Sequence, residues 1–224
     1  MDPNRQIWNE KEQELQRALA HPQQHPEAID LFLRQHAMLH AAEMAHSGLH
    51  SFADEALEGL SEADFRRIPP KSEHSVAWIL WHLARIEDVT MNLLVAGSPQ
   101  LFNQENWPER LKVTVRETGN ALDETGIADL SAAVDLEALL LYRLAVGRRT
   151  RQIVQRLRPG DFEQKVDPAC LERIMAEGAV EPPARGLIEY WGKRTIAGLL
   201  LMPPTRHNFV HLNEICRLRQ KLLH

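Results

Sequence analysis

Prolines and glycines gather at a few points in the chain, and the stretches between them are rich in leucine, alanine, glutamate, arginine and glutamine. These residues favour helices, and no segment shows the alternating valine, isoleucine and threonine typical of strands. The breaks predict long helices over about 27–60, 73–96, 130–157 and 185–223, the last interrupted at Pro203 and Pro204, and shorter ones over about 5–20, 107–120 and 168–177. We therefore expect an all-α fold, a four-helix bundle with crossover connections and short extra helices.

Composition favours an ordinary globular protein. The 224 residues include 31 acidic and 26 basic side chains, giving a formal net charge of −5, and 44% of residues are hydrophobic. No linker or repeat divides the chain, so we expect one domain over 1–224, with the bundle over about 27–223 and residues 1–26 as an N-terminal extension. The slight acidity argues against a nucleic-acid partner, and no apolar run approaches membrane-spanning length. With only two cysteines and no signal segment, we expect a cytoplasmic protein.

One histidine occupies the apolar face of the second predicted helix. At about 100° per residue, His82 falls within the stripe formed by Trp78, Ile79, Ile86 and Val89. A core histidine satisfied by one hydrogen bond would explain this position. A metal ligand facing the interior of the bundle would explain it equally well.

Two more histidines lie one turn apart in the last predicted helix. His207 and His211 are spaced i, i+4 and share the face that carries Ile215. Three imidazoles meeting in a core are costly without partners, and one divalent cation would satisfy all three. Three histidine ligands leave a tetrahedral ion with an open fourth position, as reactive sites require. Glu214 lies near the same stripe as a candidate acceptor for a ligand, a fourth ligand, a general base, or simply a solvated carboxylate.

The first predicted helix carries a separate polar stripe formed by His36, His40, Glu43 and His50. Its opposite face is apolar, so the stripe is expected to be exposed to solvent. An accessory metal site or a partner surface is the alternative. His74, which begins the second predicted helix, is a candidate for lining the mouth of the site.

The segments Ser75–Asp88 and His207–Ile215 resemble the DinB-like superfamily of bacterial metal-binding four-helix bundles, which includes thiol-dependent S-transferases and a maleylpyruvate isomerase. The family's ligands are one histidine in the second long helix and an H-x-x-x-H pair in the last. The resemblance thus implies that His82, His207 and His211 hold one divalent transition metal, most often zinc or nickel, with iron also suitable. It further implies a small-molecule substrate, a low-molecular-weight thiol as cosubstrate, and homodimers in many members.

Three functions remain open from the sequence. The first is transfer or addition of a small thiol to an electrophile, with a metal-bound thiolate as nucleophile. The second is hydrolysis by metal-bound hydroxide, with Glu214 as base. The third is a non-catalytic, metal-stabilised stress-response or binding protein, in which a protein group such as Glu214 would complete the coordination shell.

Overall fold

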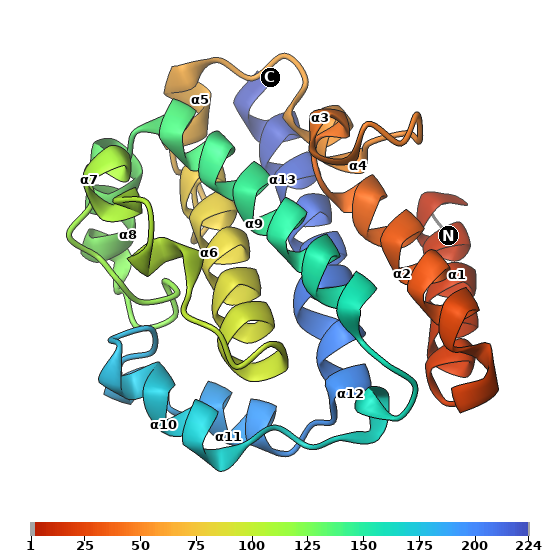
Figure 1. Ribbon diagram of the computed structural model, residues 1–224. Coiled ribbons are helices and arrows are strands. Elements are labelled where there is room, and N and C mark those ends of the chain that lie inside the picture. Colours follow the sequence, from red (N-terminus) through yellow and green to blue (C-terminus); the bar gives the residue numbers. More distant parts are fainter. Residues whose placement is uncertain (1–2, 224) are drawn as a thin grey trace.

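The computed structural model describes residues 3–223, and Figure 1 shows its helical architecture. Four of its helices contact one another in a ring, with α6 (Val76–Asp88) against α9 (Leu136–Arg156), α9 against α2 (His25–Leu39), α2 against α13 (Asn208–Leu223), and α13 against α6. The described residues contain no strand, only one isolated bridge between Lys165 and Thr195. The expected all-α fold is confirmed.

Helix α6 lies at the centre of the molecule. Ser75 caps its first turn by accepting a hydrogen bond from the Trp78 backbone, and every residue from Val76 to Asp88 is buried. The helix continues as a π-helix, η2 (Val89–Val95), and stops shortly before Gly97, whose φ is +61°. The prediction of a helix over 73–96 is therefore correct. Because α6 is buried along its whole length, each of its polar side chains must find a partner inside the protein.

The predicted helix over 27–60 is wrong as a single element. The chain instead forms α2, α3 (Ala42–Ala45) and α4 (Phe52–Leu57). Helix α2 ends at His40, whose backbone is extended and whose carbonyl accepts a hydrogen bond from the Ser51 hydroxyl. The Asp54 carboxylate accepts a bond from the Ala42 backbone. These contacts between residues 11 and 12 positions apart stabilise a bend that helical periodicity alone does not reveal.

The N-terminal helix α1 (Pro3–Leu19) packs against α2, followed by the short η1 (Pro22–Gln24). Leu15 and Phe32 are fully buried between these helices, in a core cluster that also contains Ile153 of α9. Helix α2 thus has neighbours on both sides. This packing on both sides accounts for the burial of His36 and His40, which the periodicity of the first predicted helix assigns to the solvent.

The short helix α5 (Glu62–Arg66) precedes α6. The connection over 97–135, which leads from η2 to α9, forms η3 (Leu101–Asn103), α7 (Trp107–Leu111) and α8 (Glu124–Ala133). The helix predicted over 107–120 stops early because Lys112 has a φ of +56°. The helix predicted to begin at 130 instead begins at Leu136, capped by Asp135. The Asp88 carboxylate accepts bonds from the backbones of Leu101 and Phe102, which holds this connection against the end of α6.

The C-terminal third runs along one end of the bundle before returning into it (Figure 1). Its elements are η4 (Asp161–Glu163), α10 (Pro168–Ala176), η5 (Pro182–Ala184), α11 (Gly186–Gly192), α12 (Ile196–Leu200), η6 (Met202–His207) and α13. The double proline lies inside η6, a π-helix, so helices flank it on both sides as expected. Within residues 3–223, no helix has both the length and the apolar character needed to cross a membrane.

Candidate metal centre

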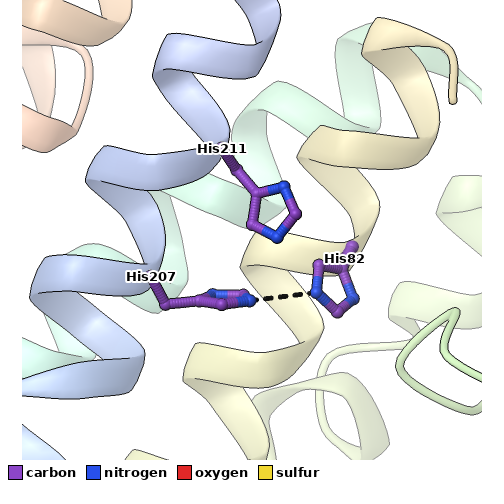
Figure 2. A group of neighbouring side chains, drawn as sticks. All are labelled: His82, His207 and His211. Atoms are coloured by element: carbon purple, nitrogen blue, oxygen red, sulfur yellow. Dashed lines mark hydrogen bonds between the residues drawn. The ribbon is translucent and has the colours of Figure 1, made fainter. Parts of the chain in front are cut away.

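Three histidines from two helical segments meet inside the bundle (Figure 2). His82 projects from α6, His207 ends η6, and His211 lies one turn later on α13. Their ring centroids are 4.6 to 5.0 Å apart, and one nitrogen of each ring lies within 4.8 Å of the other two. The structure therefore brings together the three residues that the sequence singled out.

The tautomer of His82 follows from its surroundings. Its Nδ1 lies 2.7 Å from the Thr118 carbonyl oxygen, which can only accept, so Nδ1 carries the proton and Nε2 presents a lone pair. That lone pair faces Nε2 of His207 at 3.0 Å. Without a cation, His207 must donate its Nε2 proton in this contact, which leaves its buried Nδ1 without a hydrogen-bond partner among the described residues.

Glu214 orients His211. One carboxylate oxygen lies 2.8 Å from Nδ1 of His211, and the other lies 2.8 Å from Nδ1 of His74. Although burial opposes ionisation, the hydrogen bonds from His211 and His74 lower the pKa of Glu214 to about 2. The ionised carboxylate is thus an acceptor for Nδ1–H of His211, and Nε2 of His211 is left free to bind a cation.

His74 lies beside the three histidines rather than among them. Its ring stacks on Trp78 at 3.8 Å, and Trp78 stacks on His82 at 4.9 Å. The indole therefore fixes the plane of His82, while His74 supports Glu214. The sequence placed His74 near the site but did not reveal either contact.

Burial keeps His82 and His207 neutral. Desolvation, reinforced by the neighbouring His211, lowers the pKa of His82 to about 3. Desolvation also lowers the pKa of His207 well below its usual value, with His82 adding to the effect. Neutral imidazole is the form that ligates a metal, so the donor set fits a divalent cation near pH 7.

A small cavity of about 70 Å³ adjoins His82 and His207. Apart from the two histidines, its walls are mainly apolar and aromatic, with one amide, and consist of Ile86, Asn120, Leu187, Tyr190, Trp191, Met202 and Pro203. Roughly two water molecules would occupy such a volume. The side of the three-histidine cluster that faces the cavity is consequently accessible to a small group.

The expectation of a solvent-exposed stripe on the first helix is wrong for two of its members. His36 and His40 are 0% and 1% exposed, and their Nε2 atoms lie 2.8 and 3.1 Å from the two oxygens of Glu87 on α6. His50 and Glu43 do lie at the surface. His36 and His40 are buried because α2 is sandwiched between α1 and the other helices.

Sequence reasoning missed Glu87, Thr118 and Asn208. Glu87 belongs to the polar side of α6, and only its complete burial shows that it needs internal partners. Thr118 acts through its backbone carbonyl, which carries no residue-specific signal. Asn208 directly follows His207, and this adjacency is the one feature of the sequence that could have linked it to the site.

Comparison with models of known protein families gives a match to the DinB superfamily over residues 51–215. The matched range includes His82, His207, His211 and Glu214, whereas His36 and His40 precede it. A search of curated proteins finds no match.

Proposed function

The chain belongs to the DinB superfamily, a metal-binding family, and we propose on that basis that His82, His207 and His211 bind one divalent transition-metal ion. One observation carries the proposal. Three imidazoles converge, and in two of them a fixed hydrogen-bond acceptor holds the proton on Nδ1 and leaves Nε2 for the cation. Zinc and nickel suit such a nitrogen donor set, and iron is also suitable.

The reaction that this site supports best is transfer or addition of a small thiol to an electrophile. When bound, a divalent ion with an open position stabilises a thiolate near neutral pH. The protein supplies the rest: Thr118 and Glu214 orient two of the imidazoles, and the cavity beside His82 offers an apolar wall formed by Tyr190 and Trp191. This apolar wall lines the side on which an electrophile would approach.

The role of Glu214 helps to separate the alternatives. A non-catalytic, plugged site would need a fourth protein ligand, but both oxygens of Glu214 contact Nδ1 atoms that point away from the shared centre. In a hydrolase that relied on Glu214 as its base, a carboxylate whose pKa is about 2 would be a poor proton acceptor. Both observations support thiol chemistry over hydrolysis or a purely structural ion.

The first test is elemental analysis of untagged protein, comparing wild type with His82→Ala, His207→Ala and the surface control His50→Ala. We expect about one equivalent of transition metal per chain in wild type and in the control, and none in the other two. Absence of metal from wild type after reconstitution would overturn the proposal.

The reaction class is tested next, by screening electrophiles with and without added low-molecular-weight thiols. Turnover that requires the thiol and disappears in His207→Ala supports thiol transfer. Turnover in water alone supports hydrolysis.

A further inference from the structure

A second polar cluster lies fully buried beside the three-histidine site. At its centre is Glu87, whose carboxylate accepts four hydrogen bonds. Oε1 accepts from His36 at 2.8 Å and Thr150 at 2.7 Å, and Oε2 accepts from His40 and Asn208 at 3.1 Å each. The network joins α2, α6, α9 and the first residue of α13.

The ligand atoms of His36, His40 and Glu87 lie within 4.8 Å of one another, which on distance alone describes a cation site. The charges argue otherwise. The buried guanidinium of Arg143 donates to Leu39 O at 2.8 Å and Asn208 Oδ1 at 3.0 Å, next to the same carboxylate. With neutral histidines, Glu87 and Arg143 sum to zero, whereas a divalent ion would add two uncompensated charges to the core. The charges of the cluster are therefore balanced without a metal.

Asn208 connects this cluster to the metal centre. It directly follows His207, and its amide also donates to the Pro203 carbonyl at 3.0 Å. Residues 202–207 form a π-helix, whose wider turn changes the direction in which the following side chains point. By holding both the start and the end of this turn, Asn208 determines the orientation of His207.

We propose that Glu87, acting through Asn208, is a positioning residue that holds Nε2 of His207 toward His82. This inference rests on the proposed metal site. Outer partners that orient a metal ligand typically change metal affinity by about 10–100-fold when they are replaced. Glu87 differs from the usual partner because it acts on the backbone turn that precedes the ligand and does not touch the ligand ring.

The test uses Glu87→Gln and Asn208→Ala in the full-length chain, both of which retain all three histidines. Cobalt(II) affinity is measured by competition with a chromophoric chelator, and the visible spectrum of the bound ion reports its ligand geometry. We expect roughly 10–100-fold weaker binding and an altered spectrum in both variants. The control Leu15→Ala removes side-chain volume from the separate core cluster, so it destabilises the protein but leaves affinity and spectrum unchanged.

A second readout needs no metal. Nitrogen chemical shifts of the histidine rings in metal-free protein report tautomer and environment, and Glu87→Gln should move those of His207 while leaving those of surface His50 in place. Unchanged shifts and unchanged cobalt affinity would overturn the inference.

Other outcomes are separable. Wild type that binds no cobalt overturns the proposed metal site, whatever Glu87→Gln does to the ring shifts. A second equivalent of metal that is lost in His36→Ala would overturn the charge argument and make the Glu87 cluster a cation site.

Discussion

Replacing His82 with glutamine in the metal-free protein should remove a specific pH dependence of stability. Glutamine carries an amide donor, as neutral histidine carries an N–H, but it does not titrate between pH 5 and 8. In wild type, burial lowers the pKa of His82 to about 3, so the ring stays neutral in the folded protein throughout this range. In the unfolded chain it titrates near its ordinary pKa of about 6.5.

The sign and size follow from proton linkage. As pH falls through about 6.5, the unfolded chain gains a proton at His82 that the folded protein does not, so wild type loses stability. Between pH 7.5 and 5 this loss amounts to RT ln(1 + 10^1.5), or about 2 kcal/mol. The glutamine variant lacks this contribution, so its free energy of unfolding should fall by about 2 kcal/mol less over the same interval.

The assay is urea unfolding followed by tryptophan fluorescence, at several pH values between 7.5 and 5 and with chelator present throughout. Leu15→Ala is the control, since it lowers stability without removing a titratable group, and its curve should run parallel to wild type. If wild type and His82→Gln also run parallel, His82 is not held neutral, and the electrostatic description of the site is wrong.

Three further predictions concern the same region. Glu214→Gln should weaken metal binding by about 10–100-fold in chelator competition, because it removes the charge that holds the Nδ1 proton of His211. Gly147→Ala should lower the free energy of unfolding by about 1–3 kcal/mol in urea, since the new Cβ would lie 2.8 Å from Nδ1 of His40, whereas Gly186→Ala, with nothing within 4 Å, should not destabilise. Metal at 1,000 times its Kd should stabilise wild type by about 4 kcal/mol, raising Tm by roughly 8–16 °C in thermal scans, but should not do so in His211→Ala.

Helical periodicity and the positions of proline and glycine predicted α6 and the all-α fold because both depend on local sequence. They failed over 27–60, where the helix ends at His40 through contacts with Ser51 and not through a local helix-breaking residue. They also failed at Lys112, whose left-handed backbone ends α7 without a glycine. Helix boundaries set by contacts distant in sequence are invisible to a local pattern.

The candidate site shows the same division. His82, His207 and His211 could be found because each lies on the apolar face of its own helix, which requires no knowledge of the partner helix. Thr118 acts through a backbone carbonyl on a connection whose path depends on the Asp88 contacts. The sequence could therefore predict the inward-facing rings but not the acceptor that fixes the tautomer of His82.

Four pairs of histidines in the chain have i, i+4 spacing. For two of them, His36 with His40 and His207 with His211, the position of the nearest carboxylate decides their different roles. In the pair His36 and His40, Glu87 lies on the Nε2 side, so both rings donate to it and no lone pair remains directed at a common point. In the pair His207 and His211, the carboxylate of Glu214 lies on the Nδ1 side of His211, which leaves Nε2 directed toward His82. A carboxylate that contacts Nε2 of both rings occupies the position that a metal ion would take. A carboxylate that contacts Nδ1 of a ring holds the proton there and leaves Nε2 of that ring free to bind a metal. The i, i+4 spacing is thus neutral between the two outcomes, and the third partner distinguishes them.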